Sequence, residues 1–179
     1  MNFEIRNACR ADQSSIEQLI VHSARKLGVC DYSSNQIEAA LRGAFGVDTQ
    51  LIDDGTYYVA ETEGVIVGCG GWSRRRTLFG GDSYGRRDAS ELDPAVDAAK
   101  IRAFFVDPGH ARQGIGRVLL ARCEAEARAQ GFASFELMST LTGVKLYQNF
   151  GYQQRPMVRH LVSTDVMIEF VPMHKRSAV

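Results

Sequence analysis

This 179-residue chain has no excess of either charge, because its 21 acidic residues balance its 21 lysines and arginines. A neutral protein has little long-range attraction for an anionic polymer or an anionic bilayer. We therefore expect neither a nucleic-acid partner nor a membrane partner. Any anion that the protein binds must be held by a local site.

Long apolar runs are missing as well. No uninterrupted stretch approaches the roughly 20 apolar residues that cross a bilayer, and the first residues, Met-Asn-Phe-Glu-Ile-Arg, lack the apolar segment of a signal peptide. These absences predict a cytoplasmic protein.

Cysteine and histidine are scarce and scattered, with four of each. Cys9, Cys30, Cys69 and Cys123 show no CxxC or Cys/His spacing, which argues against a disulfide framework and against a metal site. We expect reduced thiols that mostly pack as small core residues, and no metal cofactor.

The length and the 45% hydrophobic content are typical of one domain, which we expect to span residues 1–179. Apolar periodicity and turn signals predict strands and helices in alternation. The predicted strands are 3–6, 56–60, 65–72, 100–106, 132–138, 157–162 and 166–171; the helices follow residues 11–15 and 31–35 and cover 114–130 and 142–149. This order predicts an α/β (α+β) fold with a mixed, mostly antiparallel central sheet and flanking helices.

The long stretch from Ser73 to Asp97 interrupts this pattern, and we expect a functional or mobile loop. Its run Arg74-Arg75-Arg76 is typical of a solvated loop, with an acidic-substrate clamp as the alternative. In the helix that follows, Glu124 and Arg128 are spaced for an i,i+4 pair on the solvent side.

The segment 106–120 carries the strongest functional signal, since a strand ends at Asp107-Pro108-Gly109 and glycines lead into a helix. The first turn of a helix has unpaired N–H groups and a partial positive charge, so a phosphate approaches closely where Gly114 and Gly116 carry no side chain. Glycine there also serves simple close packing against a sheet. Neither a full GxGxxG nor a Walker sequence is present.

From Lys100 to Tyr152 the chain resembles the GNAT superfamily of acetyl-CoA-dependent N-acetyltransferases. The resemblance rests on Val106-x-Pro108, on the glycine loop before the long helix, and on 146–152 (Leu-Tyr-Gln-Asn-Phe-Gly-Tyr), which is similar to the family's Leu-Tyr-x-x-x-Gly-Phe. It implies that the strand ending at Val106 splays from the strand near Phe135 and that acetyl-CoA lies in the gap.

The resemblance also implies which residues bind the cosubstrate. Ala111 stands where the family has an arginine or glutamine, so backbone N–H groups carry the binding while Arg112 and Arg117 add positive charge. Thr140 stands at a cofactor-contacting asparagine position, or merely caps a helix. The implied set is Phe105, Val106, Ala111, Arg112, Gln113, Gly114, Ile115, Gly116, Arg117, Thr140 and Tyr147.

For catalysis, the resemblance implies that Tyr147 protonates the departing CoA thiolate. The family's usual glutamate base is replaced here by Arg102. The base is therefore left open among Glu61, Glu91, Asp107 and His110, or the amine arrives already neutral.

The function implied is transfer of acetyl from acetyl-CoA to a primary amine of a small molecule or peptide, by direct attack. The loop from Ser73 to Asp97 would lie beside the acceptor pocket. A noncatalytic acyl-CoA-binding or regulatory module is the alternative, as is another acyl group such as succinyl, whose carboxylate would meet Arg74–Arg76 or Arg102. A homodimer stays open.

Overall fold

The fold is built around an eight-stranded sheet, which a computed structural model describes over residues 3–85 and 87–176. The strands are β1 (Glu4–Asn7), β2 (Tyr57–Thr62), β3 (Val65–Ser73), β4 (Ala99–Val106), β5 (Ser134–Ser139), β6 (Gln153–Gln154), β7 (Val158–Ser163) and β8 (Val166–Arg176). The α-helices are α1 (Gln13–Leu27), α2 (Ser34–Ala40), α3 (Thr49–Asp53), α4 (Ile115–Ala129) and α5 (Val144–Gln148), and short 3₁₀ turns cover Arg10–Asp12, Pro108–His110 and Leu141–Gly143.

The sheet has the order β1-β2-β3-β4-β5-β8-β6, and β7 pairs with β8. All pairings are antiparallel except β4 with β5, which run parallel because α4 connects them as a crossover. This confirms the mixed, mostly antiparallel sheet that the sequence predicts.

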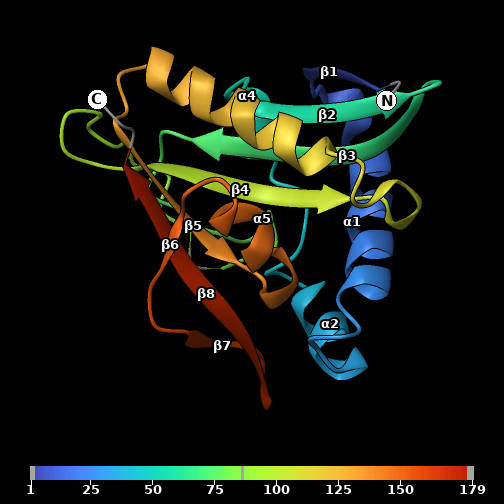
Figure 1. Ribbon diagram of the computed structural model, residues 1–179. Helices are drawn as coiled ribbons and strands as arrows, with labels where there is room; N and C mark the ends of the chain where they lie inside the picture. Colours follow the sequence, from blue (N-terminus) through green and yellow to red (C-terminus); the bar gives the residue numbers. More distant parts are fainter. Residues whose placement is uncertain (1–2, 86, 177–179) are drawn as a thin grey trace.

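Two apolar layers cover the opposite faces of this sheet. Helices α4 and α5 pack on the near face in Figure 1, whereas α1 lies on the far face. Successive side chains of β2 point to opposite faces of the sheet. Tyr58 and Ala60 pack in the layer with α4, whereas Tyr57 and Val59 pack in the layer with α1. A Cβ on Gly68 would lie 2.5 Å from the Ile115 side chain, so this glycine lets α4 pack tightly on β3.

The parallel strands β4 and β5 separate after a short stretch. They pair only at Ala99–Phe135, Lys100–Glu136 and Ile101–Leu137. Beyond Ile101, β4 stays paired with β3 and β5 with β8. The facing edges of the two strands are therefore open to other partners over the second half of β4.

The structure departs from the predicted elements in several places. Helix α3 was not predicted, and β8 runs on to Arg176 rather than ending near 171. Glu124 and Arg128 do pair, at 2.6 Å, but the expected solvent position is wrong for Glu124, which is buried. Lys175 reaches Glu124 from β8 at 2.7 Å, and this second partner offsets the cost of burial.

The segment between β3 and β4 is irregular, as predicted. Arg76 is exposed, as expected of a solvated loop, but Arg74 and Arg75 are partly buried. Arg75 donates two hydrogen bonds to Asp54, at 2.7 and 2.8 Å, and Arg74 contacts both Asp54 and Glu91. Carboxylates of the protein therefore hold the start of this loop. Because Arg74 and Arg75 already pair with them, these two residues are not available to bind an acidic substrate.

All four cysteines are free thiols. Cys69 and Cys123 are buried, as expected, whereas Cys9 and Cys30 are exposed.

Candidate functional site

A cavity of about 710 Å³ opens where β4 and β5 separate. It is lined by the end of β4, by the loop and first turn of α4, by α5 and by the α1–α2 region. Of the predicted cofactor-binding residues, all except Gln113 line it. Gln113 turns its side chain back and donates to the Gly109 carbonyl oxygen at 3.2 Å.

Gly114 forms the entrance of α4 at one end of this cavity. It has φ 91° and ψ −1°, a left-handed conformation that glycine adopts without strain, and it caps the helix with no side-chain hydrogen bond. The first bond to the cap is from Val118 N to Gly114 O, at 3.0 Å. The N–H groups of the first turn are thus left for a ligand.

Three cations gather at this end of the cavity. Arg112 and Arg117 belong to the loop and to α4, and Lys145 belongs to α5; all three are exposed and line the cavity. None forms an ion pair with any residue in 3–85 or 87–176, whereas most arginines of those ranges do. Arg112 itself has φ 65°, an unfavourable backbone conformation for a residue with a Cβ. Helix N–H groups and unpaired cations are the groups with which proteins bind anions.

A β-bulge lies in β4 beside the cavity. The register passes from Gly71–Arg102 to Cys69–Phe105, so Ala103 and Phe104 lie opposite Gly70 alone. Ala103 has φ 57°, and its carbonyl oxygen accepts from the Tyr57 hydroxyl at 3.3 Å. The bulge interrupts the ladder and re-aims the following residues, so that Phe104 faces α5 while Phe105 faces α1 and α2.

Tyr147 of α5 reaches the cavity from the α4 side. Its ring packs edge-on against Phe104 and Tyr152, with centroids 6.2 and 5.8 Å away. Burial raises the pKa of Tyr147 well above its usual value, so the hydroxyl is protonated at neutral pH. A buried phenol that faces a cavity is placed to give up a proton there.

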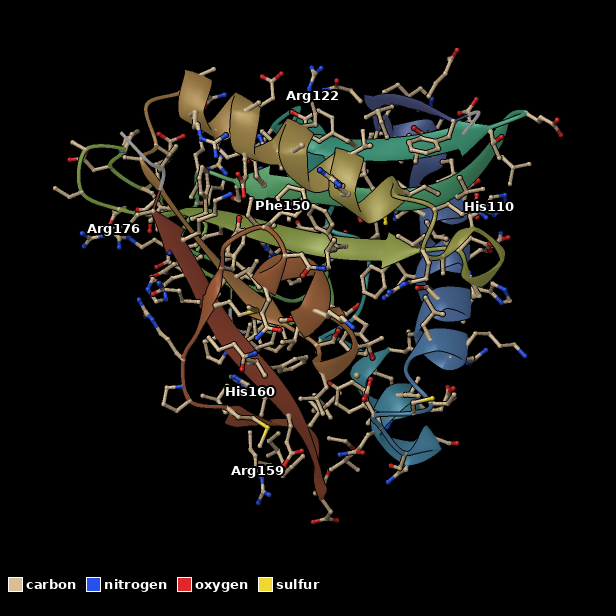
Figure 2. The ribbon with its side chains drawn as sticks, in the orientation of Figure 1. His110, Arg122, Phe150, Arg159, His160 and Arg176 are labelled. Atoms are coloured by element: carbon tan, nitrogen blue, oxygen red, sulfur yellow. The ribbon has the colours of Figure 1, made fainter. Side chains whose placement is uncertain are left out.

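Thr140 lines the cavity after β5, and its hydroxyl also accepts from the Gly143 backbone N–H at 3.2 Å. It therefore caps the turn Leu141–Gly143 while it faces the cavity. Asn149, which sequence reasoning did not select, lines the same region with Phe150. Figure 2 shows Phe150 beneath α4, after the end of α5.

The base candidates lie outside the cavity lining. Glu61 accepts from Arg6 at 2.6 Å, and Glu91 pairs with Arg74. His110, at the end of β4 in Figure 2, has Nδ1 3.0 Å from Asp107.

Among the base candidates, Asp107 lies next in sequence to a cavity residue, Val106. Burial opposes its ionisation, but hydrogen bonds from His110 and from the Gly109 N–H lower its pKa overall. A carboxylate with a lowered pKa is a poor base for an amine.

Arg102, at the position of the family's glutamate, also points away from the cavity. Its Nη2 donates to the Gly80 carbonyl oxygen at 2.8 Å and lies 2.7 Å from Asp48 Oδ2. The alternative in which Arg102 meets an acyl carboxylate therefore lacks support from this geometry.

The α1–α2 side of the cavity was not predicted from sequence. Side chains from α1, from α2 and from the segments on either side of α2 meet there, and no sequence motif marks them: Ser23, Ala24, Leu27, Tyr32, Ile37 and Phe45.

The sequence matches the model of the acetyltransferase (GNAT) family over residues 16–152, and the chain belongs to that family. It is accordingly an acyl-CoA-dependent N-acetyltransferase. No curated protein is similar enough in sequence to count as a match.

Solved structures share the fold. A GCN5-related N-acetyltransferase from Rhodopseudomonas palustris has 18% identity and a TM-score of 0.72, covering 98% of this chain and 96% of its own. PaiA N-acetyltransferase from Thermoplasma acidophilum, in complex with coenzyme A, has 15% identity and a TM-score of 0.66, with 98% and 99% covered. YncA from Salmonella typhimurium, with its cofactor acetyl-CoA, has 18% identity and a TM-score of 0.65, with 100% and 96% covered.

No helix in residues 3–85 or 87–176 is long and apolar enough to cross a membrane. Within the same ranges, no group of three or more histidine, cysteine or acidic side chains is arranged to hold a metal ion.

Proposed function

We propose that the cavity between β4 and β5 binds acetyl-CoA and that the enzyme transfers the acetyl group to a primary amine of a small molecule or peptide. The observation that carries the proposal is the alignment of three features along one cavity. These are the uncapped start of α4 with its free cations, the open edge of β4, and the protonated Tyr147.

The start of α4 suits the pyrophosphate of CoA. First-turn N–H groups donate to the phosphate oxygens. Gly116 lines the cavity, and a Cβ there would lie 3.2 Å from the Leu146 side chain, so this glycine lets α5 pack close to the first turn of α4. Within residues 3–85 and 87–176, Arg112, Arg117 and Lys145 pair with no carboxylate, so their charges are available to the phosphates. Ala111 supplies no side-chain donor, and the backbone therefore carries the contact.

The open edge of β4 suits the pantetheine arm. Phe105 and Val106 pair with β3 on one side and have no β5 partner on the other. Main-chain groups at an open strand edge pair with the amides of an extended ligand. In this proposal the arm points the thioester toward the bulge at Ala103 and Phe104, and a backbone N–H group near the end of β4 stabilises the oxyanion.

The reaction proceeds by direct attack. The amine nitrogen bonds to the thioester carbonyl carbon, and the carbon–sulfur bond breaks as the oxyanion collapses. Tyr147 gives its proton to the departing thiolate and regains one from solvent, while the amine's proton leaves to water. The products are an amide and free CoA, and no covalent enzyme intermediate forms.

Two neighbours with the same fold were solved with CoA or acetyl-CoA bound, which supports the choice of cosubstrate. The whole chain, residues 1–179, acts as one domain in this proposal. The four free thiols fit a reducing compartment, and we place the reaction in the cytoplasm.

The test is a thiol-release assay with acetyl-CoA and a panel of amines: phenethylamine, putrescine, lysine, an aminoglycoside and a peptide N-terminus. Mass spectrometry of the acceptor checks that acetyl is transferred to nitrogen. We expect amine-dependent thiol release with at least one member of the panel. Tight CoA binding without thiol release from any amine would make the protein a noncatalytic module instead.

A further inference from the structure

The cavity wall formed by α1, α2 and the far face of β4 is apolar. Its residues share a lack of charge: Leu27, Tyr32, Ile37, Phe45 and Phe105. Phe45 and Phe105 meet edge-on, with centroids 5.9 Å apart. Phe45 packs in turn on Phe170, which contacts Phe79 of the β3–β4 loop and His160 of β7. This wall lies on the opposite face of β4 from Tyr147. Under the proposed function, the amine approaches the thioester from the side of this wall.

No aspartate, glutamate or histidine lines the cavity in the described parts of the chain. The carboxylates packed around the wall have other partners within the protein. Thr142 donates to Asp31 at 2.5 Å, Arg159 pairs with Glu169 at 3.0 Å, and Arg102 and Arg87 pair with Asp48 at 2.7 and 2.5 Å. Asp107 pairs with His110.

The tyrosine in this wall offers no base either. The Tyr32 hydroxyl donates to the Glu169 carbonyl oxygen at 2.7 Å and accepts from the Leu141 N–H at 2.8 Å. Burial raises the pKa of Tyr32 to about 12, so the phenol is neutral at working pH. Its role is to tie the α1–α2 turn to β8 and to the turn after β5.

An ammonium that enters such a site loses its hydration and gains no counter-ion, which is strongly unfavourable. The neutral free base of an amine avoids that cost, and it is also the nucleophilic form. We infer that the acceptor is a primary monoamine with an aromatic or bulky apolar body, and that it binds as the uncharged free base. This inference rests on the proposed function and names its acceptor class.

Free-base binding replaces a general base on the enzyme. Solution equilibrium removes one proton from the ammonium before binding, and water takes the second after nitrogen attacks the carbonyl. Polyamines and aminoglycosides are excluded, because they would bring additional ammonium groups against Phe45 and Ile37. Their kcat/KM should be lower than that of phenethylamine by at least about a hundredfold.

The first experiment measures phenethylamine binding to the enzyme–CoA complex by calorimetry from pH 7 to 9. An alkylamine has a pKa near that of lysine, about 10.4, so its free base increases about tenfold per pH unit over this range. The apparent Kd should fall by the same factor. The Kd of 2-phenylethanol, a neutral analogue of the same shape, should stay constant. A phenethylamine Kd that does not change with pH overturns the inference.

The second experiment adds the missing carboxylate. Leu27 is half-buried and lines the cavity, while Val29, two residues away, is exposed and does not. Leu27→Glu should raise kcat/KM for putrescine relative to phenethylamine by about tenfold, because the ammonium gains a counter-ion. Val29→Glu adds the same charge outside and should leave the ratio unchanged. An unchanged ratio in a folded, CoA-binding Leu27→Glu enzyme overturns the explanation.

The amine panel separates failure of this inference from failure of the proposed function. Turnover of putrescine or lysine in preference to phenethylamine overturns the acceptor class and keeps the acetyltransferase. CoA binding without thiol release from any amine overturns both.

Discussion

Arg102 and Asp48 form an ion pair inside the protein, with 2.7 Å between guanidinium nitrogen and carboxylate oxygen and exposures of 4% and 0%. The pair joins β4 to the segment before α3. Arg87 adds a second contact to Asp48, at 2.5 Å, and so fastens the β3–β4 loop to the same carboxylate. Arg102, which stands at the position of the family's glutamate base, therefore stabilises the fold.

The first prediction concerns this pair. Arg102→Met leaves Asp48 buried with only Arg87, and breaking a buried pair from one side costs about 3–5 kcal/mol of unfolding free energy. Arg159→Met removes an exposed partner of Glu169 and should cost less than about 1 kcal/mol. Urea denaturation measures both. Equal, small losses would show that the buried pair does not support the fold.

The second prediction concerns the anion site. Arg112→Gly removes a charge and suits the positive φ at that position, so stability should hold or improve. Combined with Arg117→Gln, it should weaken CoA binding by about tenfold or more and reduce the salt dependence of Kd. Arg42→Gln is the matched control, because Arg42 is exposed and does not line the cavity. Isothermal titration calorimetry at several salt concentrations measures these affinities. An unchanged CoA affinity in the double variant would show that the phosphates bind elsewhere.

The third prediction concerns the β3–β4 loop, which reaches the acceptor wall through Phe79. Phe79→Leu loosens the aromatic packing behind Phe45 and should raise the acceptor KM several-fold while CoA affinity stays at the wild-type value. Phe132→Leu makes the same change beside Trp72, away from the cavity, and should leave the acceptor KM unaltered. A weaker CoA affinity in Phe79→Leu, without an acceptor effect, contradicts this placement.

Much of the fold could be predicted because its signals are local. The strand that ends at Pro108, the glycines that open α4 and Gly131 that follows it act over a few residues each. Gly131 follows this helix with φ 93°, the left-handed conformation in which glycine commonly ends a helix. The resemblance to the family, together with these local signals, named the residues of the α4 loop as binding candidates.

The remainder depends on contacts between distant segments. Glu124 has the spacing of a surface pair, and only the arrival of Lys175 from the last strand makes its burial tolerable. Tyr32, Ile37 and Phe45 look like ordinary core residues in sequence, and the folded chain brings them to one wall. No spacing rule links such positions, because three-dimensional packing alone sets their proximity.

The fourth prediction concerns Tyr147, whose hydroxyl is the proton donor in the proposed reaction. Because the pKa of Tyr147 is raised, its hydroxyl should stay protonated as the pH increases. The transfer rate should therefore not decline up to about pH 10. Tyr147→Phe keeps the ring packing on Phe104 and removes only the donor. Tyr152→Phe is the matched control, since its ring packs on Tyr147 but does not line the cavity.

The most direct test is single-turnover acetyl transfer from bound acetyl-CoA to phenethylamine, or to the best amine of the panel, measured by rapid quench. Single turnover removes product release from the rate. We predict that Tyr147→Phe transfers acetyl about a hundredfold more slowly than wild type with unchanged acetyl-CoA affinity, while Tyr152→Phe transfers at nearly the wild-type rate. A Tyr147→Phe enzyme with the wild-type rate would contradict the mechanism and leave water as the proton donor to the thiolate.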